Sequence, residues 1–138
     1  TASRETYRIK GETMITVHDY TSGRVFEDAL SYSFYPIDLH DEKGVVPRHL
    51  KHGTVPTIPR GALIPKGSKN IMVAGRSVSS DRLANSAARV QASSMGMGQA
   101  AAVTAVLAAR LKTTPGEVPL EKIHAELKKH NAIVPARS

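Results

Sequence analysis

The sequence contains no cysteine among its 138 residues, and this absence excludes several kinds of site. Disulfide frameworks, thiolate metal sites and cysteine nucleophiles all need that side chain. Aromatic residues are also scarce, at 4% of the chain, and tryptophan is absent. A core must therefore be built from Ala, Val, Ile, Leu and Met, and neighbouring segments would supply part of the packing.

Acidic residues are few relative to basic ones, with 12 Asp and Glu against 19 Lys and Arg and a formal net charge of +7. Such a charge permits binding to nucleic acid, an anionic membrane or a negatively charged cofactor. The basic residues are scattered, however, and the longest basic run is the pair Lys128 and Lys129. The Tyr and Phe residues are not interleaved with Arg as a base-stacking surface requires. We therefore expect no nucleic-acid partner.

Long hydrophobic runs are missing as well. The longest apolar stretch, residues 100–109, is interrupted by Thr104 and is shorter than the ~20 residues that a membrane span needs. The amino terminus has no secretory signal pattern and no initiating Met, which indicates an interior point of a longer chain or a processed end. We therefore expect a soluble protein with no membrane partner. The sequence leaves the compartment unknown and favours the cytoplasm.

The first half of the chain combines short ordered stretches with one long loop. Thr16 and Asp19 have the spacing of a capping box, which predicts a helical turn that Gly23 would close. An apolar, β-favouring run is interrupted by Pro36, as in an edge or bulged strand. The other segments expected here are a strand over 6–11, a turn over 27–30, the interrupted strand over 32–39 and a loop over 40–59.

The second half is dominated by helical patterns. A cap at Ser93 or Ser94 predicts a long helix to about Leu111, and residues 120–130 have the apolar spacing of a shorter helix. Between these helices, Thr114 and Glu117 form a second capping box. In the long helix, a stripe of alanines at four-residue spacing predicts the sheet-facing side; these are Ala101, Ala105 and Ala109. Before the long helix we expect a turn over 62–67, a strand over 71–74 and an irregular or short helical segment over 80–88.

Glycines mark both ends of the loop that joins the expected strand to the long helix. Gly75 ends the strand, and Gly96 and Gly98 open the helix. Glycine lets a backbone approach a ligand, and a helix amino terminus favours an anion. The alternative is that Gly75 only ends a strand and the other two glycines only allow close helix packing. The dinucleotide fingerprint is absent, because a third glycine and a suitably placed acidic residue are missing.

Five sequence blocks fit a known arrangement. They are RETYRIKGE from Arg4, YPIDLHD from Tyr35, IPRGALIPKG from Ile58, NIMVAGRSVS from Asn70, and Arg89-Val90 with the later MGQAA. In order and spacing these blocks resemble the carboxy-terminal third of FAD-dependent oxidoreductases that have a glutathione-reductase-like FAD domain. The resemblance extends from Arg4 to Pro135.

This resemblance implies an α+β fragment. It would be part of an FAD/NAD(P)-binding α/β fold with substrate-side strands, one long helix and one short terminal helix. Residues 1–61 would form a substrate-side segment with a long loop, and residues 62–138 would hold the last strand and the helices of the FAD domain. The glycine-rich unit that binds phosphate is missing, so we expect this segment to be inactive alone and to retain little FAD. Its partner would be the amino-terminal FAD-binding part of the same protein.

The resemblance also implies a cofactor site for the isoalloxazine end of FAD. The helix from Met95 or Gly96 would point its amino terminus at the pyrimidine edge, where flavin reduction leaves negative charge. Arg89 would add positive charge there, and the alternative for Arg89 is a salt bridge to a neighbouring loop. The expected cofactor-binding residues are Gly75, Arg76, Ser79, Arg89, Met95, Gly96, Met97, Gly98 and Gln99.

Polar residues in the substrate-side blocks are the catalytic candidates. His40 beside Asp38 is suited to take a proton while a hydride leaves to flavin N5, and Arg60 is a third candidate. Alternatively, Asp38 caps a turn and His40 lies on the surface. His49 and His52 lack a third ligand at metal-site spacing, so we expect no metal.

Two functions of different classes remain open from the sequence. In the first, the chain is part of a flavin-dependent oxidoreductase that transfers a hydride from an unidentified small-molecule substrate to flavin. In the second, it is a cofactor-free remnant or interaction module that folds independently and associates through an exposed sheet edge. A homo-oligomer is compatible with either function. The absorbance of bound flavin separates the two.

Overall fold

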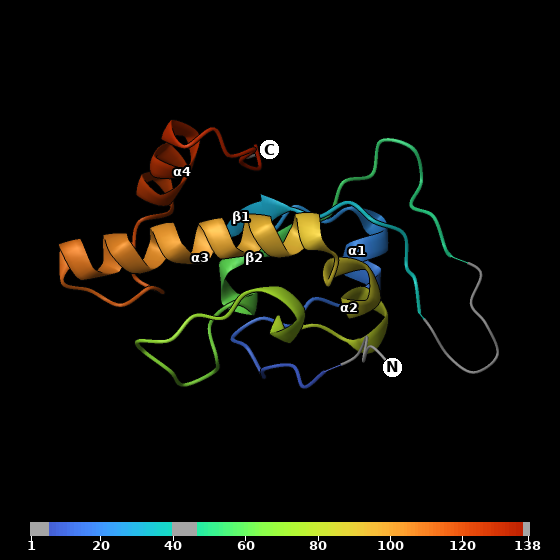
Figure 1. The fold of residues 1–138 in the computed structure, drawn as a ribbon, viewed down its shortest axis with the longest axis horizontal. Helices are drawn as coiled ribbons and strands as arrows, with labels where there is room; N and C mark the ends of the chain where they lie inside the picture. The colour runs from blue at the N-terminus through green and yellow to red at the C-terminus, as the bar shows by residue number, and fades with distance from the viewer. Residues whose placement is uncertain (1–5, 40–46, 137–138) are drawn as a thin grey trace.

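The computed structural model describes residues 6–39 and 47–136, and within them helices outweigh strands. This is the α+β fragment that the sequence predicts. Helix α3 crosses the middle of the molecule in front of the strands, and α4 lies against its carboxy-terminal half (Figure 1). In chain order the elements are α1 (Val17–Ser22), β1 (Ala29–Tyr32), β2 (Thr57–Pro59), the 3-10 turns η1 (Arg60–Ala62) and η2 (Gly75–Ser77), α2 (Arg82–Ala88), α3 (Gln91–Leu111) and α4 (Leu120–Lys129).

Helix α1 begins and ends where its capping residues predict. The Thr16 hydroxyl accepts a hydrogen bond from the Asp19 backbone N–H at 3.1 Å, and the Asp19 carboxylate accepts one from the Thr16 N–H at 3.0 Å. Gly23 then ends the helix in the left-handed region, with φ of 72°. Local sequence therefore predicts both ends of this helix.

The sheet consists of β1 and β2, which pair antiparallel with Ala29 opposite Pro59 and Tyr32 opposite Thr57. Two predictions are wrong here. The strand expected over 32–39 lies at 29–32, and β2 lies within the loop expected over 40–59. After Tyr32 the chain leaves the sheet before Pro36, which cannot donate to a ladder. The part of that loop over 40–46 lies outside the described residues.

The amino-terminal stretch pairs with distant residues instead of forming the strand expected over 6–11. Gly11 makes a single antiparallel bridge with Pro65, and Ile15 makes a parallel bridge with Ser80. Hydrogen bonds reinforce the second bridge, because the Ile15 N–H donates to the Ser79 carbonyl at 3.0 Å. The two halves of the chain are thereby joined near α1.

The strand predicted over 71–74 is also absent. Residues 71–74 carry no strand assignment, and Val73 donates one backbone hydrogen bond, at 2.8 Å, to the Leu63 carbonyl. An apolar run of this kind forms a strand only when adjacent strands complete its ladder. No such neighbour lies among the described residues.

Helix α3 begins at Gln91, earlier than the predicted caps at Ser93 and Ser94. Val90 occupies the N-cap position without a side-chain hydrogen bond, and the Ser94 N–H donates to the Val90 carbonyl at 2.9 Å. The sequence prediction failed because it required a polar cap. At the other end, Lys112 closes the helix with φ of 55°. Residues 80–88 were expected to be irregular or to form a short helix, and they contain the short helix α2.

The buried face of α3 differs from the predicted one. Ala105 and Ala109 are exposed and Ala101 is only half-buried, so the alanine stripe does not face the sheet. Apolar residues surround this helix on all sides, so their spacing does not select a face. The buried face contacts β1 and is formed by Ser93, Met97, Ala100, Thr104 and Ala108.

By length and composition alone, α3 is long and apolar enough to cross a membrane, with 21 residues and a mean hydropathy of 1.2. The expectation of no membrane span rested only on the apolar stretch over 100–109, which is about half of this helix. One such helix is weak evidence for a membrane span, because a core helix of a soluble protein passes the same test. Only 28% of the 18-residue apolar stretch within this helix is buried in the described structure. Much of this helix therefore stays available for further packing.

Helix α4 has the predicted bounds and the predicted buried face. Leu120, Ile123 and Leu127 are all buried against the core. Only half of the second capping box forms, and it closes a turn before α4: the Glu117 carboxylate accepts from the Thr114 N–H at 3.1 Å, but the Glu117 N–H donates to the Thr114 carbonyl and not to its hydroxyl. Hydrogen bonds from the Thr114 and Thr113 hydroxyls and from the Thr114 N–H lower the pKa of the Glu117 carboxyl.

Asp81 joins the first turns of two helices, and its removal is expected to destabilise both. One carboxylate oxygen accepts from the Ala84 N–H at 2.8 Å and caps α2, while the other accepts from the Val17 N–H of α1. We expect Asp81→Ala to lower the free energy of unfolding by about 1–3 kcal/mol, because two N–H groups lose their acceptor. Urea unfolding measures this. Asp81→Asn keeps a capping oxygen and should restore part of the loss; an Ala variant as stable as wild type would contradict the double cap.

Candidate functional site

The first turn of α3 and the turn η2, which begins at Gly75, lie side by side. Gly75 opens η2 in the left-handed region, with φ of 78°, a conformation that favours glycine. A Cβ atom on Gly75 would lie 3.6 Å from the Ser94 hydroxyl oxygen, which is ordinary contact. The backbone of η2 therefore lies close to the first turn of α3 at Gly75.

The amino terminus of α3 is uncapped by any side chain. Its internal hydrogen bonding begins at the Ser94 N–H, so the helix itself leaves the N–H groups of Gln91, Ala92 and Ser93 unpaired. Together they carry about half a positive charge. The helix therefore does not open at Met95 or Gly96 as predicted, and its anion-favouring end lies one turn earlier.

Arg89 lies immediately before this end and holds the backbone around Asp38. Its guanidinium donates to the Asp38 carbonyl at 3.1 Å, and the Asp38 N–H donates to the Ser86 hydroxyl at 3.1 Å. The structure therefore brings Asp38 and Arg89 together, through the Asp38 backbone. His40, which the sequence predicts to act beside Asp38, lies outside the described residues.

Arg60 has a different environment from the other catalytic candidates. Its guanidinium donates to the Val118 carbonyl at 2.6 Å and so ties η1 to the turn before α4. The structure does not place it with Asp38, which is held by α2 and Arg89. These contacts give Arg60 a structural role, and its predicted catalytic role stays a prediction.

The remaining predicted cofactor residues are distributed over several faces. Ser79 is buried, and its hydroxyl accepts from the Gly11 N–H at 3.0 Å. The Met97 side chain is fully buried in the core, whereas Met95 is 75% exposed. Residues on the outward surface near α3 and η2 are Arg76, Met95 and Gly98, while Gly96 and Gln99 line a cavity on the β1 side.

Sequence reasoning missed a buried chain of hydroxyl groups that anchors the first turn of α3. The Tyr20 hydroxyl of α1 lies 2.9 Å from that of Ser33, which lies 2.8 Å from that of Ser93. Burial raises the pKa of the Tyr20 hydroxyl, although hydrogen bonds with Ser33 and Tyr35 act in the opposite direction. No sequence signal joins these three residues, because they are brought together only by the tertiary fold.

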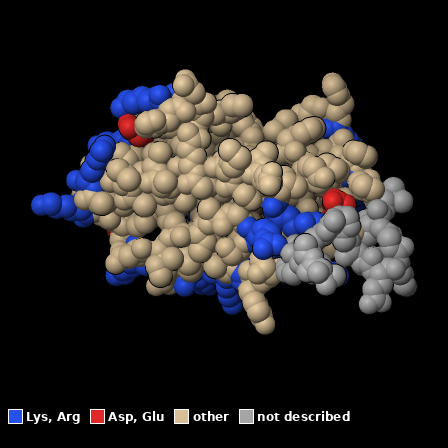
Figure 2. Space-filling model, in the orientation of Figure 1, with Lys and Arg blue, Asp and Glu red and all other residues tan. Residues whose placement is uncertain are grey.

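The outward face of α3 is almost uncharged. Between Gln91 and Leu111 the sole charged residue is Arg110, although the chain carries a net charge of +7. Figure 2 shows this uncharged band, with Lys and Arg gathered toward its edges. The face also exposes large hydrophobic side chains, including Met95 and Val106. Contiguous apolar surface of this kind marks a site where another surface packs.

Comparison with known proteins gives one positive result. The family model described as FAD dependent oxidoreductase matches residues 2–127. Searches of curated proteins and of solved structures gave no match. Because the family match covers nearly the whole sequence, the chain belongs to the FAD dependent oxidoreductase family.

Proposed function

We propose that this chain is the carboxy-terminal part of a flavin-dependent oxidoreductase with a glutathione-reductase-like FAD domain, and that it supplies the isoalloxazine end of the FAD site. The supporting observation is the uncapped first turn of α3, which lies against Gly75 and directly follows Arg89. These groups offer unpaired N–H donors, a close backbone approach and a positive charge. This combination suits the pyrimidine edge of a flavin.

FAD, when bound, supplies a two-electron acceptor at its N5 atom. The first-turn N–H groups of α3 and the Arg89 guanidinium would hold the pyrimidine edge of the flavin and would stabilise negative charge there. Asp38 and His40 remain the candidates for taking the substrate proton. Arg89 positions the first of them by holding its backbone carbonyl.

The amino-terminal FAD-binding part of the same protein is the proposed partner of the outward face of α3. That face exposes Met95 by 75% and Val106 by 49%, and the alanines between them leave a smooth surface. Small residues allow another backbone to approach closely. Under this proposal, residues 62–138 complete the FAD domain, residues 1–61 form part of the substrate wall, and the chain alone is inactive.

Flavin retention in the intact protein tests the proposed site. Ala92 is exposed in the first turn of α3, among the N–H groups that would face the flavin. Ala105 is also exposed and lies about 20 Å further along the axis. We expect Ala92→Leu to lower the flavin content per purified protein by about tenfold, because its side chain would fill the flavin edge. Ala105→Leu should retain flavin close to the wild-type level.

Ala105 is the appropriate control because it is exposed, whereas Thr104 is fully buried and its substitution would disturb the core. Equal flavin in both variants, or greater loss in Ala105→Leu, would contradict a flavin contact at this end of α3. A colourless intact protein would favour the cofactor-free interaction module. Tight stoichiometric FAD binding by the 138-residue chain alone would show that this chain already holds a complete FAD site.

A further inference from the structure

Three buried side-chain hydroxyls connect α1 to the first turn of α3, and we call them the hydroxyl chain. They belong to Tyr20, Ser33 and Ser93, each of which is at most 3% exposed. The hydroxyl oxygens of Tyr20 and Ser33 lie 2.9 Å apart, and those of Ser33 and Ser93 lie 2.8 Å apart. The Tyr20 hydroxyl also donates to the Tyr35 carbonyl at 3.3 Å. The hydroxyl chain therefore joins α1, the end of β1 and α3.

The donors and acceptors define the direction of the hydroxyl chain. A carbonyl only accepts, so the Tyr20 hydroxyl uses its one proton on Tyr35 and accepts from Ser33. Ser33 has then used its own proton and accepts from Ser93. Burial raises the pKa of the Tyr20 hydroxyl, so this group keeps its proton and stays a donor. In this direction every hydroxyl proton has an acceptor.

Residues 33–38 are held to the start of α3 at both ends. At one end is the hydroxyl chain, which reaches Ser93 in the first turn. At the other end, the Arg89 guanidinium donates to the Asp38 carbonyl at 3.1 Å, and the Asp38 N–H donates to the Ser86 hydroxyl at 3.1 Å. No side chain caps α3 between these two points. The two attachments therefore set the position of its uncapped end.

We propose that Tyr20, Ser33 and Ser93 are positioning residues, which hold the first-turn N–H groups of α3 in place against the pyrimidine edge of the flavin. This role rests on the proposed function, because it needs flavin at that end of α3. The three groups are buried and act through the backbone of α3, without contact with cofactor or substrate. The field of a helix end falls off within one turn, so a small displacement of this turn changes how well it stabilises reduced flavin.

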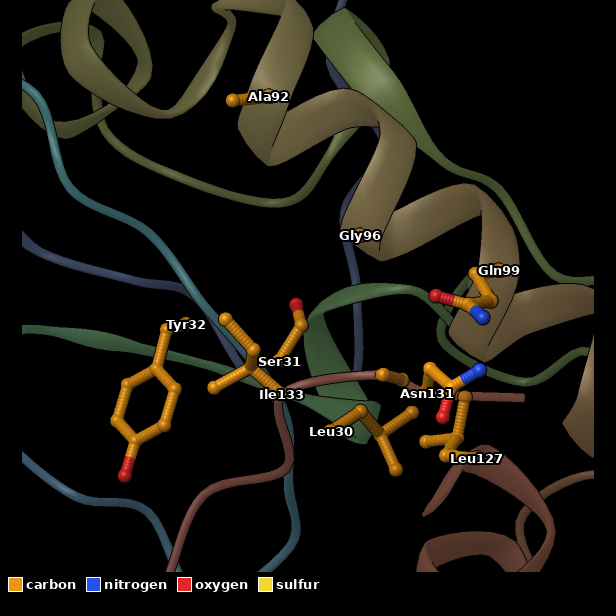
Figure 3. A pocket seen from close by; sticks show the side chains of 10 residues that line it. Leu30, Ser31, Tyr32, Ala92, Gly96, Gln99, Leu127, Asn131 and Ile133 are labelled. Atoms are coloured by element: carbon orange, nitrogen blue, oxygen red, sulfur yellow. The ribbon is translucent and has the colours of Figure 1, made fainter. Parts of the chain in front are cut away.

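Two residues of β1 provide matched controls. Ser31 is also a buried serine, but its hydroxyl oxygen has no hydrogen-bond partner among the described residues, and it lines the cavity between β1 and α3 (Figure 3). The Tyr32 hydroxyl accepts from the Ala136 N–H at 3.2 Å, and its ring points away from α3 (Figure 3). Ser31→Ala and Tyr32→Phe therefore remove the same atoms as Ser33→Ala and Tyr20→Phe and leave the hydroxyl chain complete.

Reduction of the intact, flavin-loaded protein against a reference dye tests the positioning role. At the wild-type midpoint potential, we expect Tyr20→Phe and Ser33→Ala to lower the ratio of reduced to oxidised flavin by about fivefold, because the displaced helix end stabilises the added charge less. Hydrogen exchange in the first two turns of α3 should become about tenfold faster in both variants. Ser31→Ala and Tyr32→Phe should change both quantities by less than about twofold.

Ser93→Ala separates positioning from stability. It breaks the attachment of α3, so it should lower the flavin ratio as much as Ser33→Ala does. It leaves no hydroxyl proton without an acceptor, whereas Ser33→Ala leaves the buried Ser93 proton unpaired. The folding equilibrium constant in urea should therefore fall about tenfold less for Ser93→Ala than for Ser33→Ala. The opposite order of stability would contradict the direction of the hydroxyl chain.

Flavin-loaded Ser93→Ala with the wild-type ratio would overturn the positioning role and leave the proposed flavin site standing. Changes of equal size in Ser31→Ala or Tyr32→Phe would also overturn the positioning role, because those variants keep the hydroxyl chain. A wild-type intact protein that purifies without flavin would contradict the proposed function itself, and the positioning role with it. If Tyr20→Phe fails to fold, Ser93→Ala decides, because it removes one oxygen atom and leaves no buried proton unpaired.

Discussion

Replacing Met97 by alanine should lower the free energy of unfolding by about 2–5 kcal/mol, whereas Met95→Ala should change it by less than about 0.5 kcal/mol. The two methionines lie two residues apart in α3 and have opposite environments. Met97 is fully buried in the core that joins α3 to the strands, and Met95 is 75% exposed. Truncating the first therefore leaves a cavity, and truncating the second removes contacts with solvent only.

Urea unfolding monitored by circular dichroism measures both changes on the same chain. Because both substitutions convert methionine to alanine in one helix, the gain in helix propensity cancels between them. Equal effects, or a larger effect at Met95, would show that the buried face of α3 is not the one described. In the intact protein, the same comparison reveals whether a further surface covers Met95, since its substitution would then become costly there.

The substitution Gly11→Ala, which adds one methyl group, is expected to lower the free energy of unfolding by about 1–3 kcal/mol through overpacking. The added Cβ atom would lie 2.7 Å from the Ser79 Cβ and 2.8 Å from the Gly61 carbonyl oxygen. A backbone carbonyl cannot rotate away as a flexible side chain can. The three segments that meet here must therefore separate.

Gly98→Ala provides the control for this second prediction. No atom lies within 4 Å of a Cβ at that position, so the substitution should stabilise the isolated chain by about 0.5–1 kcal/mol through helix propensity. Thermal unfolding of the two variants should therefore shift in opposite directions. A Gly11→Ala variant that melts at or above the wild-type temperature would contradict the close approach at Gly11.

Local signals in the sequence predicted the helices whose ends carry capping residues. Thr16, Asp19 and Gly23 determine α1, and the apolar spacing over 120–130 determines α4. The start of α3 was misplaced because Val90 caps it without a polar side chain. Its buried face was mispredicted because alanine and glycine offer little contrast between one side and another.

Long-range pairing was the part that the sequence could not supply. β2 spans only three residues and exists because β1 lies beside it, while the run over 71–74 is apolar enough for a strand but lacks a partner among the described residues. In the candidate site, Asp38 and Arg89 both belong to the sequence blocks that resemble the family, and the structure places them in contact. The cavity beside Ser31 was not predictable, because it arises where three distant segments leave a space.

The bridge between Ile15 and Ser80 has a consequence for the order of events during synthesis. The Ile15 N–H and carbonyl pair with Ser79 and Asp81, at 3.0 and 2.9 Å, so each partner is translated more than sixty residues later. Closing so long a loop carries an entropy cost that only later contacts offset. On the ribosome, the backbone N–H and carbonyl of Ile15 therefore stay hydrated until residues 79–81 emerge. A nascent chain stalled before that point would expose Ile15 and the surrounding apolar side chains to chaperones.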